Sequence, residues 1–254
     1  MVRNVLVTGA AGGIGRAIVE YLQRAGVNVL DVDIRGTSIC CDLADPEARA
    51  ELLETIRSTV SHLDAVVAAA GILGGAPPAV ISVNVFGATR LLEGLRPLLA
   101  KSASPRALVL SSLASRFPTD QAVVEACLAD DESEARRLAD ISTFQPYATS
   151  KATLSRWVRR HAVAPEWGGA GILLNAIAPG VIVDTGMTRP LLDAPGGSER
   201  LQQLTPSAIG RFGTPDDIAR LVGFLVGPDN RFITGQVICA DGGCDALQRG
   251  DTVW

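Results

Sequence analysis

Tyr147 and Lys151 stand four residues apart in the segment PYATSKATLSRW. On a helix this spacing places both side chains on one face, so the phenol and the ammonium lie close together. A phenol is almost fully protonated at neutral pH, and a lysine ammonium together with a positively charged nicotinamide would lower its pKa by favouring the phenolate. The pair predicts a general acid/base, although the pattern alone is as typical of an ordinary surface helix.

Two serines follow an apolar run in RALVLSS at 106–112. Such a run is typical of a buried strand in a parallel sheet. Ser111 and Ser112 then lie at the carboxyl edge of the sheet, where ligands bind in folds of this kind. A hydroxyl there can hold a substrate carbonyl oxygen.

The segment VLVTGAAGGIGRAIVEYL places Gly9, Gly13 and Gly15 between an expected strand and an expected helix. A dinucleotide pyrophosphate binds the free backbone N–H groups at such a turn. The spacing GxxxGxG is looser than GxGxxG, so a tight turn with close helix packing is the alternative interpretation.

An acidic residue, Asp33, ends the second expected strand, where the adenosine ribose of a dinucleotide would lie. Its carboxylate can accept from both ribose hydroxyls and would repel a 2′-phosphate, so NAD is favoured over NADP. Arg35 is the counterargument, because a guanidinium could attract that phosphate. It would do so beside Asp33 and Asp31.

Short apolar runs alternate with helical patterns along the whole chain, which predicts one α/β domain over 1–254 with a doubly wound parallel sheet and helices on both faces, a Rossmann fold. The expected strands are 4–9, 27–33, 63–71, 106–112, 172–180 and 235–243. The expected helices are 13–25, 46–60, 82–100, 147–164 and 215–226.

Composition excludes several classes of partner. The net charge is −4 and the basic residues are scattered, so neither nucleic acid nor an anionic membrane is expected. The N-terminus has neither a signal peptide nor a membrane span, which makes a cytoplasmic location the default. Five cysteines form no CxxC pair and the two histidines are isolated, so no metal site is expected.

Taken together, these motifs resemble the short-chain dehydrogenase/reductase family over nearly the whole chain. The residues that carry the resemblance are TGAAGGIG at 8–15, CDLAD at 41–45, AAAG at 68–71, SVNVFGA at 82–88, LSS at 110–112, YATSK at 147–151, NAIAPG at 175–180, GRFGTPDDIA at 210–219 and TGQVICADGG at 234–243.

The resemblance implies a catalytic role for four residues. Tyr147 would be the acid/base, Lys151 would bind the nicotinamide ribose and lower the tyrosine pKa, Ser112 would orient the substrate oxygen and Asn84 would hold a water. The implied NAD contacts are Gly9, Gly13, Ile14, Gly15, Asp33, Ile34, Arg35, Asp42, Leu43, Ala70, Gly71, Tyr147, Lys151, Pro179, Ile182 and Thr185.

Two positions depart from the family pattern. AAAG stands where NNAG is usual, so Ala68 lacks an amide that ties the central strand. The threonine expected near the carboxamide comes one place late, as Thr185.

The chain most resembles the bacterial 3α-hydroxysteroid dehydrogenase/carbonyl reductase type, which implies hydride transfer between NAD and a hydrophobic secondary alcohol or ketone, steroids included. The alternatives are a 3-oxoacyl-thioester reductase and a catalytically idle NAD-sensing scaffold. Homodimers or homotetramers are usual in this family.

Two segments are expected to shape the substrate site. Residues 186–209 are the expected lid, with Met187, Leu191, Leu192 and Leu201 as apolar contacts. Residues 113–146 form an insertion before the tyrosine helix, whose apolar members Val123, Val124, Cys127, Leu128, Leu138 and Ile141 predict two short helices against the domain.

The insertion contains the charged run ADDESEARRLAD at 129–140. Its charge pattern predicts a solvated helical face, with Glu132 paired to Arg136 one turn later. We expect the insertion to cover the face of the tyrosine helix that meets a second subunit in much of the family, and so to displace the usual dimer contact.

Overall fold

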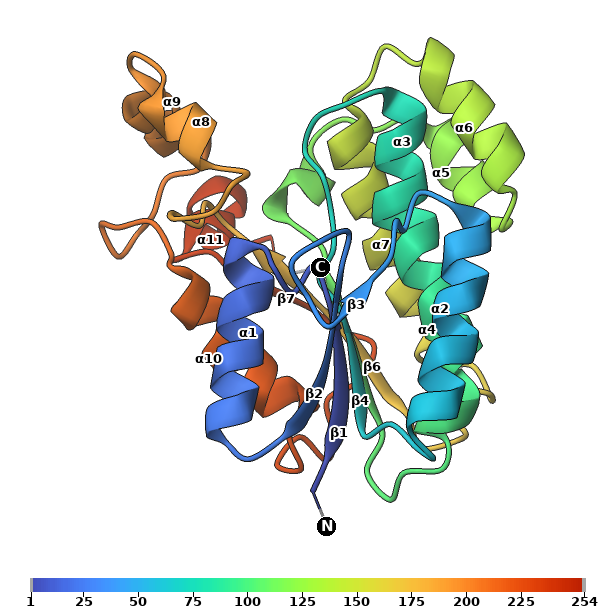
Figure 1. The fold of residues 1–254 in the computed structure, drawn as a ribbon. Coiled ribbons are helices and arrows are strands. Elements are labelled where there is room, and N and C mark those ends of the chain that lie inside the picture. The colour runs from blue at the N-terminus through green and yellow to red at the C-terminus, as the bar shows by residue number, and fades with distance from the viewer. Residues whose placement is uncertain (1, 253–254) are drawn as a thin grey trace.

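One parallel sheet runs through the computed structural model, which describes residues 2–252. Within those residues seven strands lie in the order β3-β2-β1-β4-β5-β6-β7 (Figure 1). They are β1 (Asn4–Thr8), β2 (Asn28–Asp33), β3 (Ile39–Cys40), β4 (Ala65–Ala68), β5 (Arg106–Leu110), β6 (Leu173–Pro179) and β7 (Val237–Ala240). The predicted Rossmann fold is confirmed, because the order reverses at β1, between β2 and β4.

Helices cover both faces of this sheet (Figure 1). α1 (Gly13–Arg24) and α10 (Pro215–Val226) pack against each other on one face, and their apolar sides enclose one core with the strands. On the other face, α2 (Pro46–Thr59), α4 (Gly87–Leu99) and α7 (Pro146–His161) enclose a second core. Both cores hold the strand ends in place, and the candidate site lies where those ends meet.

Several short elements were not predicted from the sequence. The helix expected at 82–100 starts earlier, with α3 (Pro77–Ile81), and passes through a π-helical turn, η1 (Ser82–Phe86), before α4. Strand β3 and the helix α11 (Cys244–Arg249) were also missed. Pro77 and Pro78 fit the first turn of α3 because its N–H groups have no partner within the helix.

The 113–146 segment contains the 3-10 turn η2 (Leu113–Arg116) and two helices, α5 (Gln121–Leu128) and α6 (Glu132–Ile141). α6 packs on α3, and a small core between insertion and domain contains Val123 and Cys127 together with Phe86. Ile141 was wrongly expected in this contact, since it is 70% exposed at the end of α6. α5 lies along α7, where Arg156 donates to Gln121. That the insertion displaces the usual dimer contact stays a prediction.

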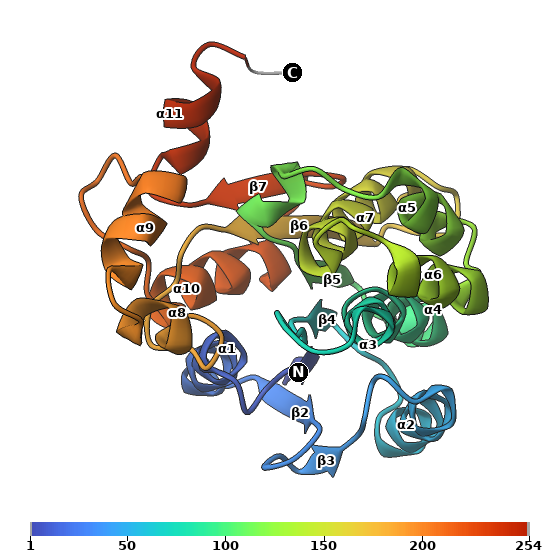
Figure 2. The same ribbon diagram turned by 90° about the horizontal axis from the view of Figure 1, so that it is seen from above.

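The 186–209 segment forms α8 (Arg189–Asp193) and α9 (Gly197–Leu204), which stand on the other side of the strand ends from the insertion (Figure 2). α11 lies next to it, and Gln248 Nε2 donates to the carbonyl oxygen of Leu204 at 2.7 Å. No helix within residues 2–252 is both long and apolar enough to cross a membrane.

Candidate active site

A cavity of about 780 Å³ lies at the carboxyl ends of the strands. The loops after β1, β2, β4, β5 and β6 line it, together with α7 and the first part of the lid. Every residue that the sequence analysis assigned to NAD lines this one cavity, as does Ser112. Asn84 is not at its surface and lies buried behind it.

The glycine loop after β1 can exist only with glycine at two positions. Gly9 has a φ of 69°, and a Cβ there would lie 2.8 Å from the backbone of Ala70. A Cβ on Gly15 would overlap the carbonyl oxygen of Gly9. The loop therefore leaves a cradle at the N-terminus of α1, whose first N–H groups suit a pyrophosphate. The shape and the donors fit a dinucleotide.

Asp33 ends β2 beside this loop. Its Oδ2 accepts from the backbone N–H of Ala11 at 3.0 Å, and its Oδ1 accepts from that of Ile34 at 2.7 Å. The carboxylate is thereby fixed at the wall of the cavity. Arg35 is exposed and lines the same end, while Asp31 accepts from the backbone of Ser38 at 3.2 Å.

The next wall of the cavity is the segment Cys41, Asp42 and Leu43. The Asp42 carboxylate accepts from the N–H of Ala44 at 2.9 Å, which closes a short turn. Leu43 is buried, and a Cβ on Gly87 of α4 would lie only 2.9 Å from the Leu43 Cβ. This segment is consequently held tightly against the domain.

Lys151 and Tyr147 extend from one face of α7, as the i, i+4 spacing predicts. Lys151 is 3% exposed, and its ammonium nitrogen lies 5.6 Å from the centroid of the Tyr147 ring. The ammonium donates to the carbonyl oxygen of Leu110 at 2.6 Å. Burial lowers the pKa of Lys151 to about 8, so the charge is easily lost here.

The protein's own groups together do not lower the Tyr147 pKa. Burial raises it, and the Ser112 hydroxyl only partly opposes this effect. The protein's own groups therefore keep the phenol protonated. Lowering its pKa would require a further positive charge in the cavity, such as an oxidised nicotinamide ring.

The two serines after β5 have different surroundings. Ser111 is buried, donates to the carbonyl oxygen of Lys151 at 3.0 Å and bonds the Ser155 hydroxyl at 2.8 Å, so it positions α7. Ser112 caps η2 by accepting from the N–H of Ala114 at 3.1 Å. Its hydroxyl also faces Tyr147 and acts to lower that phenol's pKa through a side-chain hydrogen bond.

Asn84 lies in the π-helical turn η1, a feature that often marks functional sites. Its Oδ1 accepts from the N–H of Ile72 at 2.8 Å, and its Nδ2 donates to the Ile72 carbonyl at 3.0 Å. Nδ2 also donates to the Ser150 hydroxyl, which donates to the Tyr147 carbonyl at 2.7 Å. The side chain thus joins the loop after β4 to the tyrosine helix, while its water-holding role stays a prediction.

Thr8 was not predicted from the sequence as a site residue. It supplies hydrogen bonds to the AAAG segment, where Ala68 has no side-chain amide. Its hydroxyl oxygen accepts from the N–H groups of Ala69 and Ala70, each at 3.2 Å. The loop after β4 is therefore tied to β1 although Ala68 has no amide. The sequence signal that could have identified this role is a threonine at the end of the first apolar strand.

Thr185 lies where the lid begins and is 8% exposed. Its hydroxyl accepts from the N–H of Thr188 at 3.1 Å, and the Thr188 hydroxyl donates to the carbonyl of Ile182 at 2.6 Å. Its methyl group lies next to Gly13. Of the expected lid contacts, Met187 and Leu191 line the cavity but Leu192 and Leu201 do not.

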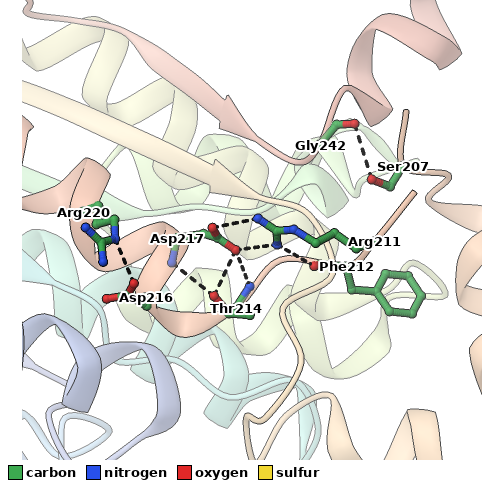
Figure 3. A network of polar contacts seen from close by, with 8 residues as sticks. All are labelled: Ser207, Arg211, Phe212, Thr214, Asp216, Asp217, Arg220 and Gly242. Carbon is green, nitrogen blue, oxygen red and sulfur yellow. Dashed lines mark hydrogen bonds and ion pairs between the residues drawn. The ribbon is translucent and has the colours of Figure 1, made fainter. Parts of the chain in front are cut away.

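The lid returns to the domain through a polar network (Figure 3). Arg211 donates from both terminal nitrogens to the Asp217 carboxylate, at 2.7 Å and 3.0 Å. Asp217 also accepts from the N–H of Thr214, which caps α10 in return. Arg211 chiefly, with Thr214, holds the Asp217 pKa well below its ordinary value. The return point of the lid is therefore fixed to the start of α10.

Comparison with known proteins agrees with this geometry. A family model described as short chain dehydrogenase matches residues 3–124, and one described as enoyl-(acyl carrier protein) reductase matches residues 133–245. The chain is 34% identical to the 3-alpha-hydroxysteroid dehydrogenase/carbonyl reductase of Comamonas testosteroni, over 96% of this chain and 97% of that protein. The chain belongs to the short-chain dehydrogenase family. The predicted resemblance is confirmed.

Solved structures of the family superpose over almost the full length. The 3-alpha-hydroxysteroid dehydrogenase from Pseudomonas sp. B-0831, complexed with NADH, gives a TM-score of 0.89 at 34% identity, covering 98% of this chain and 99% of that one. A short chain dehydrogenase from Burkholderia cenocepacia J2315 in complex with NADP gives 0.75 at 27% identity, covering 96% and 98%. Family members with this fold therefore hold either dinucleotide.

Proposed function

We propose that the protein is an NAD-dependent oxidoreductase that transfers hydride between the nicotinamide and a hydrophobic secondary alcohol or ketone. The observation that carries the proposal is the meeting of Ser112, Tyr147 and Lys151 at one end of a cavity whose other end is lined by Asp33. A steroid alcohol is the leading substrate, because two relatives, each 34% identical to this chain, are named for that chemistry.

When bound, the nicotinamide supplies or takes up the hydride. During reduction the Tyr147 phenol donates its proton to the substrate carbonyl oxygen, and during oxidation its phenolate accepts the alcohol proton. The Ser112 hydroxyl, which is adjacent to Tyr147, orients that same oxygen. The Lys151 ammonium would donate to the nicotinamide ribose and stabilise the phenolate.

The fixed carboxylate of Asp33 supports NAD rather than NADP. Its hydrogen bonds to Ala11 and Ile34 hold it on the cavity wall, where a 2′-phosphate would meet a negative charge. Arg35 is exposed, and no hydrogen bond holds its side chain among the described residues. We therefore give the carboxylate the greater weight.

The first part of the lid favours an apolar substrate. Met187, Pro190 and Leu191 line the cavity, with Leu73 from the loop after β4. These side chains offer contact area without hydrogen-bond partners, which suits a hydrocarbon skeleton.

One observation favours a second candidate, a 3-oxoacyl-thioester reductase. The family model that matches residues 133–245 is described as enoyl-(acyl carrier protein) reductase. This function would need a cavity open enough for a thioester carrier and, as a rule in the family, NADPH. The position of Asp33 disfavours that cofactor.

The test is to follow nicotinamide absorbance with NAD⁺ and a panel of 3α-hydroxysteroids and smaller secondary alcohols, and with NADPH and an acetoacetyl thioester. Turnover of the alcohols with NAD⁺ supports the proposal. Turnover of the thioester alone supports the second candidate. Dinucleotide binding without turnover of any alcohol, ketone or thioester would instead indicate an idle scaffold.

A further inference from the structure

The charged run at 129–140 contacts the domain in two different ways. Asp130 pairs with Arg90 of α4 at 2.8 Å, and Glu134 pairs with Arg137 at 2.6 Å, with all four side chains more than 40% exposed. Asp131 caps α6 by accepting from the N–H of Glu134. These groups fit the expected solvated face.

Glu132 does not fit it. Its side chain is 16% exposed, and it pairs with Arg49 of α2 instead of the expected Arg136. The Glu132 Oε2 and the Arg49 Nη2 lie 2.5 Å apart, and the Arg49 side chain is only 6% exposed. The expected pairing was therefore wrong, because burial against α2 gives Glu132 a less hydrated cation than its own helix offers.

Arg49 also contacts the backbone of Leu43, a residue that lines the cavity. Its second terminal nitrogen, Nη1, donates to the carbonyl oxygen of Leu43 at 3.3 Å. A planar guanidinium can make both contacts at once, which a single ammonium does poorly. The insertion is consequently joined, through one buried side chain, to the wall that contains Cys41, Asp42 and Leu43.

That wall lies at the end of the cavity lined by Asp33. In the proposed function it flanks the adenine of the dinucleotide. Gly87 lies against both the Cβ and the carbonyl oxygen of Leu43, and Arg49 donates to that same oxygen. A shift of this backbone would change the width of the adenine slot.

We propose that Glu132 is a positioning residue for the dinucleotide, which holds Arg49 against the Leu43 carbonyl and so sets the adenine slot. The inference rests on the proposed function, since it assigns the adenine to this end. Without Glu132 the buried Arg49 guanidinium has no carboxylate to pair with. It then turns toward solvent and releases the Leu43 carbonyl. The insertion then governs cofactor affinity from outside the cavity.

The test compares Glu132→Ala with Glu134→Ala, a matched acidic residue two positions further along the same helix whose partner is exposed. Affinity for NADH and for AMP is measured by calorimetric titration, with thermal unfolding and circular dichroism beside it. Glu132→Ala is expected to weaken both ligands by roughly tenfold. Glu134→Ala is expected to change neither. Turnover at saturating NADH is expected to survive, because Ser112, Tyr147 and Lys151 are not displaced.

A second variant keeps the test valid if Glu132→Ala does not fold. Arg49→Lys preserves the charge facing Glu132 but cannot span to the Leu43 carbonyl as well, so it is expected to weaken AMP while the insertion stays docked. A purely structural tether would lower the melting temperature of Glu132→Ala and leave the AMP affinity of both variants unchanged. That result would overturn the inference. A wild-type protein that binds no dinucleotide would overturn the proposed function instead.

Discussion

The ammonium nitrogen of Lys151 lies 5.6 Å from the centre of the Tyr147 ring and 2.6 Å from the carbonyl oxygen of Leu110, in a position that is almost fully buried. Burial makes both groups reluctant to ionise: it raises the Tyr147 pKa and lowers the Lys151 pKa to about 8. A positively charged ligand in the cavity would oppose this effect on Tyr147 by favouring the phenolate. Shifted pKa values of this kind are typical of groups at functional sites.

Tyr147→Phe should reduce turnover by roughly two to four orders of magnitude and leave the affinity for NADH nearly intact, because only the acid/base group is removed. Lys151→Ala should damage both, since in the proposed function the ammonium would bind the ribose as well as stabilise the phenolate. Steady-state kinetics and fluorescence titration of NADH separate the two effects. Equal loss of NADH affinity in both variants would contradict this division of roles.

The buried Lys151 should also give the protein a recognisable pH dependence of stability. Its pKa is about 8 when folded and near 10.5 when unfolded. Below pH 8 both states carry the proton and the folded state bears the full cost of burying the charge, about 3 kcal/mol. Between pH 8 and 10.5 the unfolded state binds more protons, so this cost disappears as pH rises.

The comparison that isolates this effect is with Lys151→Met, whose side chain has a similar length and no charge. Denaturant unfolding at pH 7 and at pH 10 should show wild type gaining stability relative to the variant at the higher pH. If the difference in unfolding free energy between wild type and variant is the same at both pH values, burial of the Lys151 charge does not cost the folded state this free energy.

Asp33→Ala should shift cofactor choice toward NADP(H). The substitution removes the negative charge that a 2′-phosphate would meet and leaves Arg35 nearby as a cation that could pair with that phosphate. The ratio of the NADPH and NADH dissociation constants should move by about tenfold, equivalent to about 1.4 kcal/mol. A wild type that already binds NADPH more tightly would overturn the role given to Asp33.

Much of the site could be predicted from the sequence because its residues follow strand ends. Gly9, Asp33 and Ser112 each come directly after an apolar run, and the parallel topology brings those ends to one edge. Spacing on one helix joins Tyr147 to Lys151. All of these side chains line the same cavity, although nothing in the strand pattern itself identifies a substrate.

What the sequence could not supply depends on contacts between distant segments. Glu132 and Arg49 are 83 positions apart, and local helix spacing favoured Arg136 as the partner. Thr8 supports the loop after β4 from 61 residues away. The effect of burial on the Tyr147 pKa could not be predicted from the sequence either, because it depends on how the whole cavity is enclosed rather than on the nearest charge.

The anchor of the lid can be tested at Asp217 (Figure 3). Asp217→Asn should remove one of the two Arg211 contacts and weaken the capping of α10, at a cost of about 1 kcal/mol in unfolding free energy. Hydrogen exchange should then quicken over 205–214, and the KM for the substrate should rise because the lid closes less reliably over the cavity. Asp216→Asn is the matched control. It loses only an exposed ion pair with Arg220, one turn later on α10. If both variants exchange alike, the Arg211 and Asp217 pair does not anchor the lid.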